Sequence, residues 1–136
     1  MPISYDIDVS RGLVTSRAWG VLRDQEVLEH HVTLGKDPRF VATYSQLGDF
    51  REVENFELAM DTVRAMARTR FFDVTSKRAM VVGNEMALRL GRMMASVAGI
   101  AGDSVRICRS MEEARRFLGL VGGSGEATTA TAALEG

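Results

Sequence analysis

The first residues of the chain alternate between apolar and polar side chains. One side of this segment carries Ile3, Tyr5, Ile7 and Val9. Strict alternation is typical of a β-strand with one face in water, so residues 3–9 are predicted to form an edge strand. A turn at residues 10–12 leads into a second apolar run, residues 13–22, and the two runs together predict a β-hairpin. Gly20 within the second run indicates a bulge or a close backbone approach.

A short apolar run, an amphipathic segment and a second short run follow one another between residues 78 and 108. This order is typical of a strand, a crossover helix and a parallel strand, and it implies an α/β sheet buried on both faces. Asn84 is placed to cap the helix at its start. The apolar stripe expected to face the core consists of Met86, Leu90, Met93 and Val97. An adaptable ligand-binding surface is the other interpretation of these methionines.

The same periods extend over the rest of the chain and predict a single α/β domain at residues 1–120. The third strand is expected over residues 43–48 with Asp49 at its end, and Asn55 is expected to open the second helix. The four helices are expected at residues 24–34, 55–70, 84–98 and 111–118. Ser110, with Glu113 three residues later, is expected to cap the last helix, whose Ala114, Phe117 and Leu118 should face the sheet. The predicted fold is a mixed five-stranded sheet, an antiparallel N-terminal hairpin followed by βα units, packed with these helices. Residues 121–136 are rich in Gly, Ser, Thr and Ala and are predicted to be a flexible tail.

Charge is distributed unevenly over a composition that is otherwise ordinary. The 136 residues are 46% hydrophobic, but no apolar run is long enough for a membrane span, so a cytoplasmic protein is expected. Residues 1–63 carry 11 acidic and 6 basic side chains, whereas residues 64–118 carry 11 basic and 5 acidic ones. Such polarity either steers a charged partner or a head-to-tail association, or disappears when the halves intermix. No basic run is interleaved with aromatic residues, so no nucleic-acid partner is predicted.

Candidate catalytic and metal-binding residues are few. His30 and His31 point to different faces of a helix and cannot hold one metal ion together. Asp6 and Asp8 lack a third ligand in register, which favours a solvated strand face. Cys108 is either a reactive thiol beside two arginines or a buried small residue, and the second is expected. The chain is therefore predicted to have no catalytic residue, no cofactor and no metal site.

Four parts of the sequence carry a family resemblance. They are Ile3-Ser-Tyr-Asp with Arg11-Gly-Leu-Val14, then Asp37-Pro-Arg-Phe40, Asp49-Phe-Arg-Glu-Val53 and Ser110-Met-Glu-Glu-Ala-Arg-Arg-Phe-Leu118. With them in place, residues 2–120 resemble the small bacterial STAS-like domains, the fold of the anti-sigma-factor antagonists, in a branch that is mostly uncharacterised. The resemblance implies a protein-binding regulatory module without an active site of its own.

The phosphorylated members of that family carry a serine or threonine at the start of the helix after the third strand. The corresponding residues here, 51–57, contain no hydroxyl, so the usual phospho-acceptor is missing. A partner protein is still expected to bind this turn and the first turn of the helix. The residues predicted to contact it are Asp49, Arg51, Glu54, Asn55 and Leu58.

The predicted function is a non-enzymatic regulatory or protein-interaction module of the STAS type, with a partner of unknown identity. The alternative is a carrier for a small molecule or lipid, because related sheets in the CRAL-TRIO lipid-transfer proteins bind apolar ligands. In that case the methionines and Trp19 would line a cavity. A homodimer through the first strand is also considered, although Asp6 and Asp8 are charges that discourage two such edges from pairing.

Overall fold

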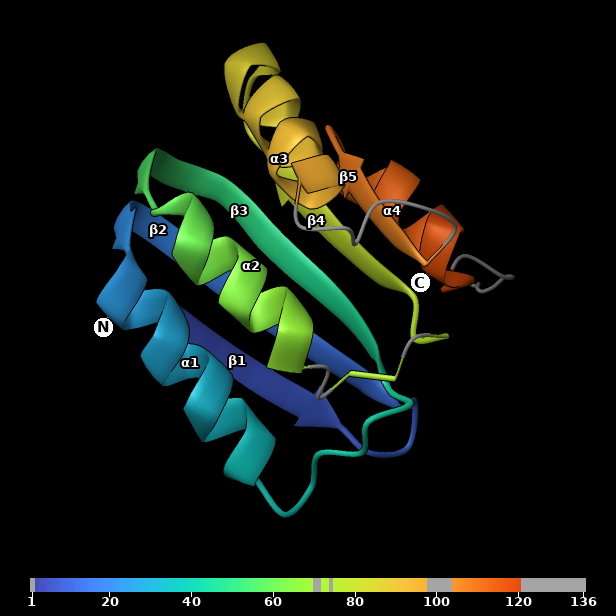
Figure 1. Ribbon diagram of the computed structural model, residues 1–136. Helices are drawn as coiled ribbons and strands as arrows, with labels where there is room; N and C mark the ends of the chain where they lie inside the picture. The colour runs from blue at the N-terminus through green and yellow to red at the C-terminus, as the bar shows by residue number, and fades with distance from the viewer. Residues whose placement is uncertain (1, 70–71, 74, 98–103, 121–136) are drawn as a thin grey trace.

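The computed structural model describes residues 2–69, 72–73, 75–97 and 104–120 (Figure 1). These residues have the α/β fold that the sequence predicts, while the predicted tail at residues 121–136 lies outside them. The elements in chain order are β1 (Ile3–Asp8), β2 (Leu13–Arg23), α1 (Asp24–Lys36), β3 (Ser45–Glu57), α2 (Met60–Thr69), β4 (Arg78–Val82), α3 (Glu85–Val97), β5 (Val105–Cys108) and α4 (Met111–Leu118).

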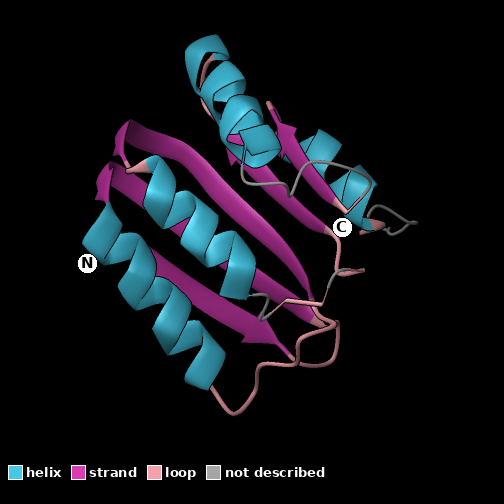
Figure 2. Ribbon diagram, in the orientation of Figure 1, coloured by secondary structure: helices cyan, strands magenta, loops and turns pink. Residues whose placement is uncertain are grey.

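The five strands lie in the sheet in the same order as in the chain. β1 and β2 are antiparallel, and the three following pairs are parallel, so the predicted hairpin and βα units are confirmed. All three crossovers step in one direction across the sheet, which places their helices on one face. Figure 2 shows α1, α2 and α3 on that face and α4 on the other.

The face under α4 is apolar where the helix covers it. The buried residues there come from four strands and from α4, namely Leu13, Leu47, Ala79, Val81, Cys108 and Ala114. Phe117 and Leu118 of α4 pack against this cluster, as the sequence predicts. The predicted cap is confirmed as well, because the Ser110 hydroxyl accepts a hydrogen bond from the Glu113 N–H at 3.0 Å.

The face under the other three helices is closed by two apolar clusters. One holds Ile7, Val14, Leu34 and Phe72, and the other holds Ile3, Ala18 and Leu22. Leu34 is only 1% exposed, so it anchors α1 to the sheet. Gly20 of β2 has a φ of 71°, and the pairing of β2 with β3 shifts register on both sides of it, each time with one extra residue in β3. The sheet is therefore irregular around this glycine, but the extra residues lie in the partner strand.

The third strand is longer than predicted, and the second helix starts later. β3 continues to Glu57, and α2 begins only at Met60, so Asn55 lies in a strand and does not open the helix. The reason is the length of β2, which pairs with β3 as far as Arg23 and Glu57. Val53 and Phe56 reach the core from this extended strand, and the same spacing imitates the stripe of a helix.

The predicted core stripe of α3 faces the wrong way. Met86 is 79% exposed and Met93 is 52% exposed, whereas Leu90 is half-buried and the side chain of Val97 lies outside the described part of the chain. The buried side of the helix carries Leu88 and Ala95 instead. Gly91 lies on that side too, where an added Cβ would be 3.1 Å from the Ile107 side chain. Small residues let the helix approach the sheet closely, so the larger methionines point away from it.

Candidate functional site

The predicted partner-binding residues lie along β3 and the loop after it. Asp49, Arg51, Glu54 and Asn55 belong to the strand, and Leu58 follows it before α2. The expectation of a turn and a first helical turn is therefore wrong for this segment. What the structure brings together is an extended row of polar side chains, in which Glu54 and Asn55 are exposed and Leu58 is half-buried.

Asp49 and Arg51 form the best-defined polar contact in this row. The Asp49 carboxylate accepts hydrogen bonds from the Arg51 Nε at 2.9 Å, from its Nη2 at 2.8 Å and from its backbone N–H at 3.1 Å. These bonds to Arg51 hold the pKa of Asp49 below its usual value and raise the pKa of the guanidinium. The pair is therefore ionised at neutral pH and fixes both side chains.

Ion pairs with β2 fix other charges of the same segment. Arg17 pairs with Glu52, and its guanidinium carbon lies 4.9 Å from the centre of the Trp19 ring. Arg23 reaches Glu57 at 3.4 Å. Trp19, which would line a cavity in the carrier alternative, is half-buried beside Arg17.

This segment is held close to the loop after β4. At Gly83, an added Cβ would be 2.7 Å from the Arg51 carbonyl oxygen, so any larger residue would clash with the backbone of β3. β4 itself pairs with β3 only as far as Phe50. Beyond that point, β3 is paired with β2 alone, and the two strands form an extension of the sheet that we call the β2–β3 extension, residues 19–23 and 51–57.

A buried polar cluster lies between α1 and the sheet. Gln46 Nε2 donates to the Ser16 hydroxyl at 3.1 Å, and the same hydroxyl lies 3.3 Å from His30 Nε2. The Tyr5 ring meets His30 edge-on, with 5.5 Å between the ring centroids. A serine beside a histidine is the geometry of an activated nucleophile, but Ser16 is only 1% exposed and already bonded to Gln46. The cluster therefore organises the core beneath α1.

The two histidines are kept neutral by burial. Desolvation lowers the pKa of His30, and it lowers the pKa of His31 to about 4, with repulsion from His30 and Arg78 adding to the effect. Arg78 stacks over the Phe72 ring at 5.2 Å. Its Nε atom is buried and makes no hydrogen bond within the described residues. The sequence offered no signal for this cluster, because its members come from β1, β2, α1, β3 and β4.

Cys108 has the environment of a structural cysteine. Its side chain is fully buried under α4. Burial raises the pKa of its thiol to about 11, so the reactive thiolate is scarce at neutral pH. Among the described residues, no three His, Cys, Asp or Glu side chains gather in a way that could hold a metal ion. None of the helices in the described ranges has the length and apolar content that a membrane crossing requires.

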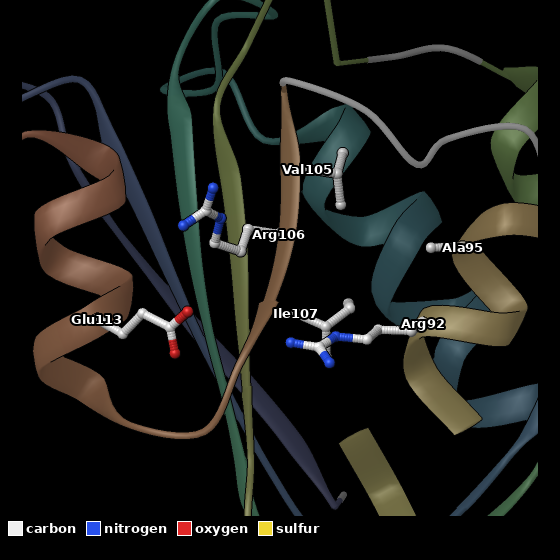
Figure 3. Close-up of a pocket in the computed structure, with 6 residues that line it drawn as sticks. All are labelled: Arg92, Ala95, Val105, Arg106, Ile107 and Glu113. Carbon is white, nitrogen blue, oxygen red and sulfur yellow. The ribbon is translucent and has the colours of Figure 1, made fainter. Parts of the chain in front are cut away.

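The surface is hollowed at the outer edge of β5, a place that the sequence did not single out. The hollow has a volume of about 330 Å³ and lies between α3 and α4 (Figure 3). Its lining consists of Arg92, Ala95, Val105, Arg106, Ile107 and Glu113. The only sequence signal for this hollow is the excess of basic side chains in residues 64–118, to which Arg92 and Arg106 belong.

The structure also decides between the two outcomes expected for the uneven charge. Because the strands keep their chain order in the sheet, the acidic first part of the chain forms the side of β1, β2 and β3. The basic second part forms the side of β4 and β5. The two halves therefore do not intermix, and the described protein has an acidic and a basic side.

Comparison with known proteins adds no family assignment. No protein-family model matches the chain, and no curated protein matches its sequence.

Proposed function

We propose that this chain is a non-enzymatic regulatory or protein-interaction module of the STAS type, without the usual phospho-acceptor. The order of its elements, two strands and then three helix–strand units closed by a last helix, is the order that the resemblance implies. The enclosure of the Ser16–His30 pair supports a role without catalysis at that pair, since a substrate has no access to a hydroxyl that is 1% exposed.

The observation that carries the proposal is the β2–β3 extension. It continues the sheet past β4, buries Val53 and Phe56 toward the core and exposes Glu52, Glu54, Asn55 and Glu57 on its outside. A rigid strand with an acidic exposed row offers a partner fixed side chains at a low cost in conformational entropy. The bound protein is expected to carry a basic surface, because opposite charges speed encounter and fix the orientation of the complex.

The test is native mass spectrometry of the protein purified gently from its own cells, followed by a binding measurement with the protein that co-purifies. Glu54→Arg combined with Asn55→Arg is expected to weaken that binding at least about tenfold, since two positive charges would then face the basic surface of the partner. Both side chains are exposed, so the fold should be preserved.

A matched control changes the net charge equally at a distance from the extension. Glu112→Arg combined with Thr33→Arg alters two exposed residues on α4 and α1 and should leave the affinity unchanged. If the double variant of β3 binds as the wild type does, the proposed surface is wrong. If only a bound molecule of a few hundred daltons co-purifies, the carrier alternative gains support.

The geometry supports the carrier alternative less than it supports the interaction module. Met86 and Met93, which were expected to help line a cavity, lie on the surface of α3. Thermal stabilisation by an added apolar ligand would be its signature, because a ligand that binds only the folded state raises the melting temperature.

A further inference from the structure

The two outer strands of the sheet, β1 and β5, carry opposite charges. On the side of α3, the edge of β5 presents Val105 and Ile107 beside Arg92, and on the side of α4 it presents Arg106 (Figure 3). β1 presents Asp6, exposed on the face opposite α1. In the described residues no strand lies beyond either edge, so both offer unpaired backbone groups.

The free backbone groups of β5 can be assigned from one hydrogen bond. The Arg78 N–H donates to the Ser104 carbonyl at 2.8 Å, so Ser104 and, two residues on, Arg106 direct their backbone groups toward β4. The backbone groups of Val105 and Ile107 therefore point outward. The side chains of these two residues face α3, since Ile107 lies against Gly91.

The same reasoning applies to β1. The Trp19 N–H donates to the Pro2 carbonyl at 3.0 Å, so the residues at even positions direct their backbone groups toward β2. The outward groups belong to Ile3, Tyr5 and Ile7. Their side chains face α1, where Tyr5 and Ile7 pack with Leu34.

We propose that copies of this chain associate head to tail, with β1 of one copy adding to β5 of the next as an antiparallel strand. When β5 of each copy is followed by β1 of the next, α1, α2 and α3 of all copies lie on one face of the continued sheet. This order also makes β1 antiparallel to the preceding β5, because β1 is antiparallel to β2 and the other strands are parallel to β2. In an antiparallel ladder, two opposed residues that exchange backbone hydrogen bonds carry their side chains on the same face of the sheet. The residues whose backbone groups point outward from β1 and β5 meet this condition, because their side chains lie on the face of α1 and α3.

The charges of the two edges select one register. With Ile107 opposite Tyr5 and Val105 opposite Ile7, Arg106 stands opposite Asp6 of the next copy on the other face. Opposed charges at this position stabilise a strand pair. Pairing of two β5 edges with Val105 opposite Ile107 would instead place Arg106 opposite Arg106 of the other copy, and pairing of two β1 edges with Tyr5 opposite Ile7 would place Asp6 opposite Asp6, so these symmetric registers are disfavoured.

The helices are compatible with this arrangement. α1 lies over β1 and β2, and α3 lies over β5, so they become neighbours between one and a half and two strand spacings apart, or roughly 7 to 10 Å, close to the distance between packed helices. Among the helices of the described ranges, none covers the opposite face at β1, since α4 packs on β3, β4 and β5.

Sedimentation velocity of the full chain tests the proposal over a range from about 10 µM to about 1 mM, because a four-residue edge should bind with a micromolar Kd. We expect the weight-average sedimentation coefficient to rise with concentration, without the plateau of a closed dimer, since head-to-tail contacts repeat. The rise should shrink when salt is added, because the charges at both edges are exposed.

Charge reversal identifies the edges. Arg106→Glu and Asp6→Lys are each expected to weaken association about tenfold, and an equimolar mixture of the two variants is expected to regain it, because each restores a complementary pair with the other. Arg64→Glu and Asp61→Lys on α2 are matched controls that lie away from both edges and should associate as the wild type does.

Hydrogen exchange provides a readout on the unchanged chain. The amides of Val105, Ile107, Tyr5 and Ile7 should gain protection with concentration, whereas amides inside the sheet should not change. A wild-type chain that stays monomeric to about 1 mM at low salt overturns the proposal, and so does association that both reversals leave intact. The proposed partner surface on β3 is not used, so either proposal can fail without the other.

Discussion

The two faces of the sheet are built in different ways. Under α4 the core is apolar, and a single amphipathic helix with a hydroxyl cap at its start covers three strands. Under α1, α2 and α3 the core includes Ser16, Gln46 and His30, and α3 approaches through Gly91 and Ala95. The buried side of a helix that packs alone on a sheet can be read from its apolar stripe. Where several helices pack side by side, each covers only part of the sheet, and the stripe indicates the buried side less clearly.

The largest expected effect concerns the side of α3 that is buried. Leu88→Ala should reduce the free energy of unfolding by about 2 to 5 kcal/mol, because it removes a side chain that is 4% exposed and leaves a cavity. Met86→Ala on the same helix should change it by less than about 0.5 kcal/mol. Urea denaturation of the two variants checks this, and equal losses would show that the methionine stripe is buried after all.

A pH effect is expected from the polar core under α1. The pKa of His31 is lowered from 6.5 to about 4 by burial, so the unfolded chain binds a proton that the folded chain does not between these values. Stability should therefore fall as the pH decreases from 6.5 to about 4, by up to about 3 kcal/mol and by less if water screens the ring.

Comparison with His31→Gln isolates this contribution from the carboxylates that also titrate in acid. Urea denaturation at pH 7 and at about pH 4.5 should show a smaller loss for the variant than for the wild type. The same loss in both proteins would mean that His31 is accessible to protons in the folded state.

The smallest expected effect concerns the α4 face. Ser110→Ala removes the cap on the Glu113 N–H and should cost about 1 kcal/mol. Because Cys108 is fully buried under α4 and the pKa of its thiol is about 11, labelling by iodoacetamide at pH 8 should be slow in the wild type. If α4 opens locally, the variant should be labelled about fivefold faster.

Ser96→Ala on α3 is the matched control for this measurement, because Ser96 is exposed. It should leave the labelling rate unchanged. Rapid labelling of the wild-type chain would contradict the burial of Cys108 and, with it, the tight packing of α4 on β5.

The sequence predicted elements well where one local signal controlled each of them. The alternation of residues 3–9 and the Ser110 cap depend on the chain within a few residues, and both are confirmed. Asn84 also caps α3 as predicted, since its side chain accepts from the Ala87 N–H at 2.8 Å. These features use hydrogen bonds and backbone angles that neighbours in the sequence supply.

The sequence-based predictions were wrong where the same residues fit both the period of a helix and the period of a strand. Val53, Phe56 and Met60 fit a helical stripe, but β2 offered a strand partner as far as Glu57, and pairing with it prevailed. The candidate partner-binding residues, which the sequence places on a turn and a first helical turn, therefore lie on β3, except for Leu58, which follows the strand. At Ala59 the backbone N–H donates to Asp24 of α1 at 3.0 Å, so the start of α2 depends on a residue far away in the chain.

By itself the sequence determined the order of strands and helices, the caps and turns, and the presence of opposite charge in the two halves of the chain. Local propensity and periodicity are sufficient for these properties. Only the tertiary structure decided which side of α3 is buried, how far β3 extends, and that Ser16, His30 and Gln46 meet in the core. These outcomes depend on close approach between distant segments, and the sequential order of the strands is what keeps an acidic edge at β1 and a basic edge at β5.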